Sequence, residues 1–208
     1  MNLELTARGL GLWRGERCLC RDLSFSVQGG TALQLAGPNG SGKTSLMRAV
    51  AGIGRLDEGE LTWNGQPVRS SLEFRTALLY LAHHNGLKAH LSTIENYNFY
   101  QSITAYPSEI TAKEALVRCG IYDLGDRPVA LLSMGQKRRA ALARLLGARA
   151  KLWLLDEPLT SLDTDGIGLV SDLLRAHLAQ GGMALLATHQ PLEVDSLLLR
   201  RLELGRAA

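Results

Sequence analysis

The sequence predicts a mixed α/β fold whose core is a mostly parallel sheet covered by helices on both faces. Short apolar segments that are typical of buried strands occur at 31–36, 151–155 and 183–188, and helical segments alternate with them. The part before residue 31 is β-rich, and Asn64-Gly65 predicts the turn of a hairpin over 60–68. The helices that we expect in the core lie at 45–51, 135–148 and 165–179.

Composition and charge exclude several classes of protein. With 208 residues, 46% of them hydrophobic and 21% charged, we expect a single globular domain over residues 1–208. The net charge of +3 is too small to indicate a nucleic-acid partner. No apolar run approaches the ~18 residues of a membrane span, and the first twelve residues include Glu4 and Arg8, unlike a signal peptide. Any association with a membrane should therefore run through a partner.

The three cysteines indicate a reducing compartment, because their number is odd and no CxxC spacing occurs. Cys18 and Cys20 could form half of a metal site. Residues two apart share one face of a strand, so we expect them instead to be a buried pair of small apolar side chains.

The middle of the chain is predicted to be helical. Ser92-x-x-Glu95 and Thr111-x-x-Glu114 are capping-box patterns, in which a hydroxyl and a carboxylate exchange hydrogen bonds with the first backbone N–H groups of a helix. Both lie within 87–126. We expect this stretch and the long helix after it to form a helical subdomain, over about 87–150, that is inserted into the α/β core.

A glycine-rich loop follows the first predicted core strand and matches the pattern GxxxxGK[ST]. Its glycines allow several backbone N–H groups to converge on one anion, and the next helix adds its positive N-terminal end. Lys43 should reach the β- and γ-phosphates of a nucleotide, and the Thr44 hydroxyl should bind Mg²⁺. The alternative, a glycine-rich turn that matches by chance, is disfavoured by the strand before it and the helix after it. The expected nucleotide site comprises Gly37, Pro38, Asn39, Gly40, Ser41, Gly42, Lys43, Thr44 and Ser45.

Two acidic residues follow a second buried strand. The apolar run 152–155 carries Asp156 to the edge of the sheet, where its carboxylate can hold Mg²⁺. Glu157 comes next and is placed to polarise the water that attacks the γ-phosphate. Alone, this pattern is also typical of a buried strand that runs into an acidic helix cap. The glycine-rich loop favours the catalytic interpretation.

The segment Leu132-Ser133-Met134-Gly135-Gln136 resembles the LSGGQ signature of ATP-binding-cassette (ABC) ATPases, with Met134 in place of one glycine. Ser161-Leu162-Asp163 resembles the D-loop of that family, and His189 resembles its switch histidine. The resemblance covers essentially the whole chain. It implies a P-loop NTPase core of the ABC type, with an N-terminal antiparallel β subdomain and the inserted helical subdomain, and it implies ATP and Mg²⁺ as the cofactors.

The resemblance also implies a homodimer. Ser133 and the backbone N–H groups after it lie at a helix N-terminus, which attracts anions. In the family this site faces the γ-phosphate that is bound by the other protomer, so one ATP would lie between Lys43 of one subunit and Ser133 of its mate. From the residues alone, Ser133 could also be a plain helix cap, the less favoured interpretation, and His189 a structural histidine.

Two positions depart from the family pattern or fit it loosely. His83 occupies the position of the usual glutamine between the core and the helical subdomain, where a neutral imidazole could contact Mg²⁺-bound water. Trp13 best matches the aromatic residue that stacks on adenine. Ordinary core packing of Trp13 remains the other interpretation.

Within the family, the chain looks most like the haem-exporter ATPases of bacterial cytochrome c maturation. The resemblance is carried jointly by His83 and by the segments 95–100, 135–145 and 187–192. It implies a peripheral subunit on the cytoplasmic face of the inner membrane, docked on integral-membrane permease subunits of a haem-handling complex.

Two other functions stay open: the ATPase of a different exporter, and a soluble ABC protein that acts as a scaffold. We do not expect His83, His84 and His90 to bind haem directly, because neither a CxxCH motif nor an aromatic pocket accompanies them.

Overall fold

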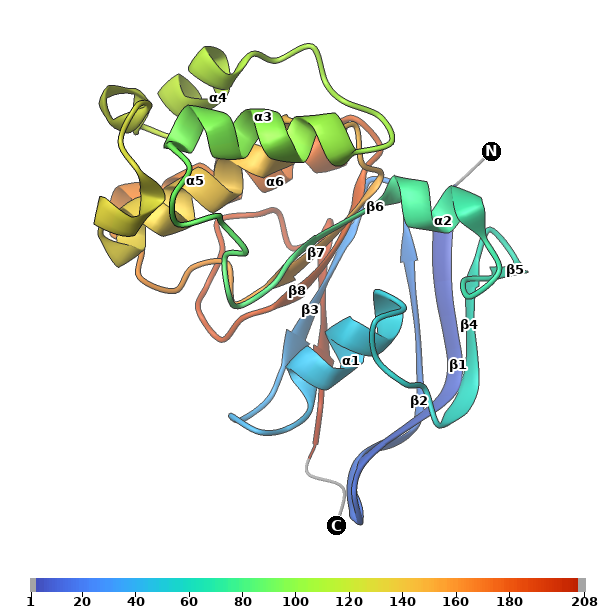
Figure 1. Ribbon diagram of the computed structural model, residues 1–208. Helices are drawn as coiled ribbons and strands as arrows, with labels where there is room; N and C mark the ends of the chain where they lie inside the picture. Colours follow the sequence, from blue (N-terminus) through green and yellow to red (C-terminus); the bar gives the residue numbers. More distant parts are fainter. Residues whose placement is uncertain (1–2, 206–208) are drawn as a thin grey trace.

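The computed structural model describes residues 3–205 and contains two sheets (Figure 1). An antiparallel sheet has the strand order β2-β1-β4-β5, and a parallel sheet has the order β6-β7-β8-β3-β9. Helix α1 lies between the two sheets, and the helices α3 to α6 cover the other face of the parallel sheet. The predicted α/β fold with an N-terminal antiparallel sheet is confirmed.

The strands of the antiparallel sheet are β1 (Glu4–Arg14), β2 (Arg17–Gln28), β4 (Glu58–Trp63) and β5 (Gln66–Pro67). Those of the parallel sheet are β3 (Ala32–Ala36), β6 (Leu78–Leu81), β7 (Leu152–Asp156), β8 (Met183–Ala187) and β9 (Leu199–Glu203). The helices are α1 (Lys43–Val50), α2 (Leu72–Ala77), α3 (Thr93–Ile103), α4 (Ala112–Arg118), α5 (Met134–Leu146) and α6 (Thr164–Ala179), with two short 3₁₀ turns at Tyr122–Leu124 and Val129–Leu131.

The parallel sheet separates two hydrophobic cores. Successive side chains of a strand point to opposite faces, so Leu152 and Leu154 pack on the α1 side, whereas Trp153 and Leu155 pack under the helices. All five residues of β7 are buried. This two-sided burial explains why the strand is a continuous apolar run and why Asp156 emerges at a fixed point on the sheet edge.

Local signals in the sequence predicted several elements correctly. The capping boxes that begin at Ser92 and Thr111 form and start α3 and α4, and the hairpin turns at Asn64-Gly65, both with positive φ. Three elements were not predicted, namely α2, β6 and β9. The first two have only six and four residues, and β9 carries two exposed arginines because it is an edge strand that pairs with β3 alone.

The prediction of a buried cysteine pair is wrong. Cys18 and Cys20 do lie two apart on β2, but Leu19 between them points into the core, with 7% of its surface exposed. Both thiols are only half-buried, and Cys20 packs against the edge of this core. No cluster of His, Cys, Asp and Glu that could hold a metal occurs in the part of the chain that the structure describes.

Acid should destabilise the fold through His177, which stacks on Trp153 with ring centroids 3.8 Å apart. Its Nε2 donates to the Met183 carbonyl, 3.0 Å away. Burial lowers the pKa of His177 from 6.5 to about 4. Because the unfolded chain then binds the extra proton, stability is full above pH 6.5 and falls by up to about 3 kcal/mol as the pH drops towards 4.

Urea unfolding between pH 4 and pH 7 checks this expectation. The variant H177F keeps an aromatic stack without a titrating group, so its free energy of unfolding should fall less than that of the wild type over this range. H90F, the same change at an exposed position, should keep the wild-type slope. Equal slopes for wild type and H177F would contradict the assignment.

Candidate functional site

The predicted phosphate loop (37–44) connects β3 to α1, as its motif requires. Gly37, Gly40 and Gly42 all have positive φ, at 137°, 79° and 100°, a backbone conformation that side chains disfavour. At Gly37 an added Cβ would also lie only 2.6 Å from the Leu204 carbonyl oxygen. The glycines thus allow the tight path that brings the chain back to the N-terminus of α1.

The polar side chains of this loop fit an anionic ligand. Lys43 Nζ donates to the carbonyls of Gly37 (2.8 Å) and Pro38 (3.2 Å), which uses two of its three N–H donors and places the ammonium at the mouth of the loop. Ser41 Oγ is buried and has no hydrogen-bond partner among residues 3–205. Because buried hydroxyls are normally paired, this orphan indicates a missing ligand.

The two predicted magnesium residues meet although they are 112 positions apart in the sequence. Thr44 Oγ1 donates to Asp156 Oδ1 at 3.1 Å, and Asp156 is 1% exposed. Two neighbouring oxygens of an octahedral Mg²⁺ shell, each about 2.1 Å from the ion, lie about 3 Å apart. The pair therefore fits a magnesium ion without rearrangement of the backbone.

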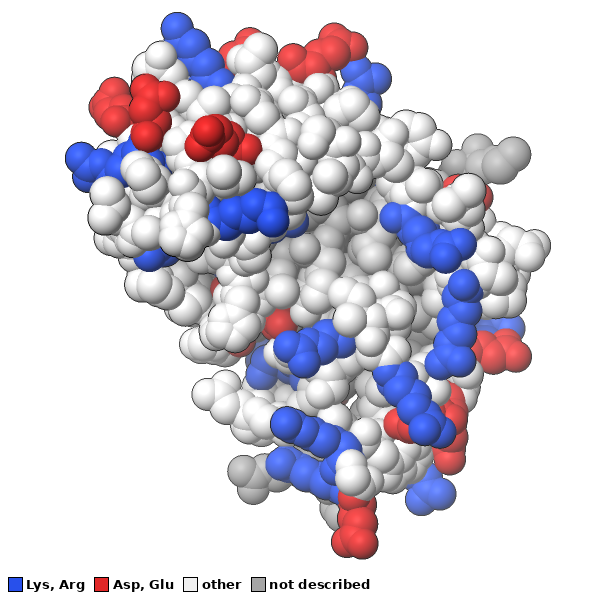
Figure 2. Space-filling view, in the orientation of Figure 1, with Lys and Arg blue, Asp and Glu red and all other residues white. Residues whose placement is uncertain are grey.

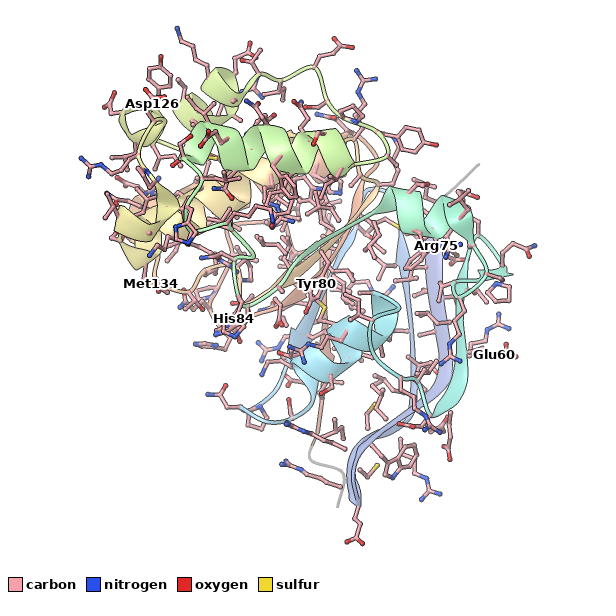
Figure 3. All side chains as sticks on the ribbon, in the orientation of Figure 1. Glu60, Arg75, Tyr80, His84, Asp126 and Met134 are labelled. Atoms are coloured by element: carbon pink, nitrogen blue, oxygen red, sulfur yellow. The ribbon has the colours of Figure 1, made fainter. Side chains whose placement is uncertain are left out.

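Tyr80 is a residue of this site that the sequence did not reveal. It lies on β6 beside β7, and its hydroxyl donates to Asp156 Oδ2 at 3.3 Å. Burial, together with the charge of Asp156, raises the pKa of Tyr80 to about 12, so the phenol stays a donor. Only the run Leu78–Leu81, a short apolar segment just before His83, could have signalled a strand there. Figure 3 shows Tyr80 between α1 and the helical layer.

Glu157 has an unusual backbone conformation that aims its side chain. Its φ is 48°, the left-handed region that costs a non-glycine residue about 1 kcal/mol. Its N–H donates to the Ala187 carbonyl at 2.8 Å, which fixes it against the end of β8. Glu157 Oε2 lies 3.5 Å from His189 Nδ1, so the two predicted catalytic groups are neighbours.

His189 is largely exposed while Glu157 is mostly buried, with 65% and 19% of their side-chain surfaces accessible. Thr188 holds the turn between β8 and the histidine. Its carbonyl accepts from Gln34 Nε2 at 3.0 Å, and its hydroxyl accepts from the Gln190 N–H at 3.2 Å. The histidine is therefore carried on a fixed backbone, with its ring open to solvent.

The predicted signature loop (132–136) begins α5. Ser133 Oγ accepts from the Gln136 N–H, and Gln136 Oε1 accepts from the Ser133 N–H, so the predicted cap is a complete capping box. Met134 is 64% exposed, whereas a Cβ on Gly135 would lie 2.8 Å from the Ser161 carbonyl. The chain therefore accepts a side chain at Met134 but not at Gly135.

The D-loop contacts the signature helix in the same chain. Ser161 has a φ of 65°, and Asp163 follows it as the N-cap of α6, accepting from the Gly166 N–H at 2.9 Å. Arg139 of α5 binds Asp163 at 2.7 Å. The hydrogen bond from Arg139, and to a lesser extent that from the Gly166 N–H, lowers the pKa of the Asp163 carboxyl. Leu162, between Ser161 and Asp163 in the sequence, packs on the hydrophobic core under the helices.

The two remaining predicted positions lie apart from these contacts. His83 and His84 are exposed in the segment after β6, with their rings 5.6 Å apart (Figure 3). Trp13 is half-buried, and its ring lies across Gly11, where an added Cβ would be 2.4 Å from the ring. Trp13 is thus absent from the fully buried core, and part of its ring remains open to solvent.

A cleft of about 330 Å³ lies between the helical layer and the lower part of the molecule (Figure 2). The residues that line this cleft include Arg75 of α2, Tyr80 of β6, and Tyr100 and Ile103 of α3. Arg144 of α5 completes it, with its guanidinium 3.5 Å from the centre of the Tyr100 ring. The cleft is therefore lined by aromatic and cationic groups close to the segment that carries His83.

Comparison with known proteins agrees with this geometry. The sequence profile described as "ABC transporter" matches residues 20–160. The chain is 42% identical over 202 residues to the cytochrome c biogenesis ATP-binding export protein CcmA of Aliivibrio fischeri, covering 97% of the chain and 99% of that protein. It is 45% identical to the protein of the same name from Salmonella typhi, with 96% of each chain covered, and 43% identical to that of Nitrosomonas europaea, with 97% and 95% covered.

The fold is also that of a solved structure, described as a putative ABC transporter ATP-binding protein from Pyrococcus furiosus. It superposes with a TM-score of 0.83 over 97% of both chains, at 21% sequence identity. At this level of identity the likeness concerns the fold alone. The family profile covers more than half of the chain, and the relatives match it over nearly its full length, so the chain belongs to the ABC transporter family.

Proposed function

We propose that this chain is the ATP-hydrolysing subunit of an exporter complex that handles haem for the maturation of c-type cytochromes. The observation that carries this proposal is the 42–45% identity, over nearly the full length, to proteins named cytochrome c biogenesis ATP-binding export proteins. The geometry supports it, because Thr44 lies beside Asp156, and Glu157 beside His189, in segments that follow the carboxyl ends of β3, β7 and β8.

Each side chain of the site has a defined part in this proposal. Lys43 and the N–H groups of the phosphate loop would hold the β- and γ-phosphates, and Thr44 and Asp156 would hold Mg²⁺. Mg²⁺, when bound, would neutralise charge that develops on the phosphates. Glu157 would polarise the attacking water as general base, and His189, 3.5 Å away, would orient it.

Other residues would complete the nucleotide site. Trp13 would stack on the adenine through the open part of its ring, and His83 would contact water on the Mg²⁺. Ser133, with the rest of the signature loop (132–136), would bind the γ-phosphate held by a second copy of the chain. The Ser133 hydroxyl is exposed and accepts from the Gln136 N–H, so its own O–H is left to donate to a phosphate oxygen, which supports such a contact. The D-loop, residues 161–163, would lie beside it at the dimer interface.

The partners would be integral-membrane permease subunits, bound at the cleft beside the segment that carries His83. No helix among residues 3–205 is long and apolar enough to span a membrane. In this proposal the subunit lies on the cytoplasmic face of the bacterial inner membrane, held there by its partners. A nucleic-acid partner is not part of the proposal.

Purification from membranes tests the proposed partners. The full chain with an affinity tag, extracted in mild detergent from its own host, should carry along multi-span proteins and haem that is visible as a Soret absorption band. A tag on an unrelated soluble protein serves as control. Recovery of a permease without haem would favour another exporter, and recovery of soluble partners alone would favour a scaffold; either result would overturn the proposal.

A further inference from the structure

Arg138 of α5 is a buried cation with an unusual set of partners. Its residue surface is 3% exposed, although the neighbours Lys137 and Arg139 in the same basic run are more accessible. Burial lowers its pKa to about 10, an effect that the charges of Asp156 and Glu157 partly oppose. At neutral pH the guanidinium is therefore a buried positive charge, which is costly unless every donor is paired.

All five N–H donors of this guanidinium are paired, and the partners come from two different segments. Nε donates to the Pro158 carbonyl at 3.0 Å, and Nη2 donates to the carbonyls of Asp156 (3.0 Å) and Glu157 (2.7 Å). Nη1 points the other way and donates to the Ala82 carbonyl at 3.3 Å and to Asn85 Oδ1 at 2.7 Å. Arg138 thus joins the end of β7 to the segment after β6.

On one side, Arg138 holds the backbone of the proposed general base. Glu157 keeps its left-handed φ of 48° only because its surroundings fix it. Its N–H is bound by the Ala187 carbonyl, and its own carbonyl is bound by Arg138 Nη2. The guanidinium is therefore one of two clamps that aim the Glu157 carboxylate towards His189.

On the other side, Arg138 binds Ala82 and Asn85 of the junction segment (82–86). The exposed His83 and His84 lie between these two residues. The same segment is bound by Arg144, whose Nη1 donates to the Asn85 carbonyl at 3.1 Å, and by the Tyr100 hydroxyl, which donates to the Gly86 carbonyl. Arg144 and Tyr100 both line the cleft described above. A change in the junction segment would therefore reach Arg138 directly.

From this juxtaposition we infer that Arg138 is a positioning residue, which couples the place of the junction segment (82–86) to the orientation of Glu157. The inference rests on the proposed role of Glu157 as general base. The essential property of Arg138 is the planar guanidinium with five N–H donors, because it can bind the end of β7 and the junction segment (82–86) at once. Lysine at this position would keep the charge but could not reach five acceptors.

The variant R138K tests the inference, with R175K as matched control, since Arg175 is half-exposed and pairs with Asp172 on the surface of α6. In the full chain, R138K should lower kcat for ATP hydrolysis by at least about tenfold, because small displacements of a catalytic group are costly. The Kd for ATP should stay close to that of R175K, whereas the thermal unfolding midpoint should fall, because lysine leaves buried acceptors of the guanidinium unpaired. Wild-type turnover in R138K, or a parallel loss of ATP binding, would overturn the inference.

A double variant separates positioning from a general structural role. If Arg138 acts through Glu157, R138K should cause no further loss of turnover in an E157Q background. An equal fractional loss in both backgrounds would contradict the coupling. The single variant E157Q tests the general base itself: unchanged turnover there would refute that role of Glu157, whatever R138K does.

Asn85→Ala probes the other end of the coupling and remains informative if R138K does not fold. It removes one acceptor of the guanidinium, 2.7 Å from Nη1, and touches none of the proposed catalytic groups directly. We expect kcat to fall by about threefold, less than in R138K because the other four hydrogen bonds of the guanidinium remain, with unchanged Kd for ATP. Turnover of N85A at the wild-type rate would overturn the link to the junction segment.

Discussion

Replacing Glu157 by glutamine should leave ATP binding intact and lower the rate of hydrolysis by about 100-fold or more, the usual contribution of a general base. The glutamine keeps the size of the side chain and its position beside His189, 3.5 Å away in the wild type. It cannot accept the proton of the attacking water. The phosphate loop, Thr44 and Asp156 are untouched, so the nucleotide should bind as before.

Two measurements check this expectation. Steady-state phosphate release gives kcat, and fluorescence titration with an ATP analogue gives Kd. Gel filtration in the presence of ATP should also show more dimer for E157Q than for wild type, because the bound nucleotide is not consumed. The control E60Q changes an exposed glutamate on β4 and should behave as wild type. Wild-type turnover in E157Q would show that another group is the base.

Replacing Lys43 by alanine should weaken ATP binding by about 10- to 100-fold, the loss of a hydrogen bond and charge contact to an ionised group. Turnover should fall further, by at least about 100-fold, because the lysine would also stabilise charge in the transition state. The ammonium lies 2.8 Å from the Gly37 carbonyl, in the loop that would hold the phosphates.

The same titration and phosphate assays measure both effects. The control K113A removes an exposed lysine of α4 and should leave Kd and kcat unchanged. Retention of tight ATP binding in K43A would contradict the assignment of the phosphate loop.

The parts of the fold that the sequence predicted are those with a local signature. The phosphate loop needs left-handed glycines, the capping boxes at Ser92 and Thr111 need a hydroxyl and a carboxylate three residues apart, and β7 needs an unbroken apolar run. Each signal is contained in fewer than ten residues. The order of these signals along the chain then predicted the parallel sheet that brings Thr44 and Asp156 together.

What the sequence left out depends on contacts between distant segments. Tyr80 joins the site only because β6 pairs with β7, and its strand is four residues long. Arg138 looks like part of a solvated basic run until α5 is packed against Asp156 and Ala82. Leu19, between the two cysteines, fills the core, whereas Cys18 and Cys20 stay half-buried although Cys20 packs against the edge of that core.

We propose that each ATP site combines Lys43 of one subunit with Ser133 of another. Within residues 3–205, the Ser133 hydroxyl bonds only to the start of its own helix, so the chain alone does not bring the two together by a hydrogen bond. In a two-fold dimer each subunit contributes a phosphate loop to one site and a signature loop to the other.

Mixing two inactive variants tests this directly. K43A lacks one half of the site, and S133R blocks the other half with a bulky side chain. Half of the dimers in an equal, freely exchanging mixture carry both variants, and each of these has one intact site. Turnover should therefore recover to about a quarter of the wild-type rate if the two sites act independently. If mixed dimers form, as shown by capture through a tag on one variant, and ATP hydrolysis still does not recover, the shared site is wrong.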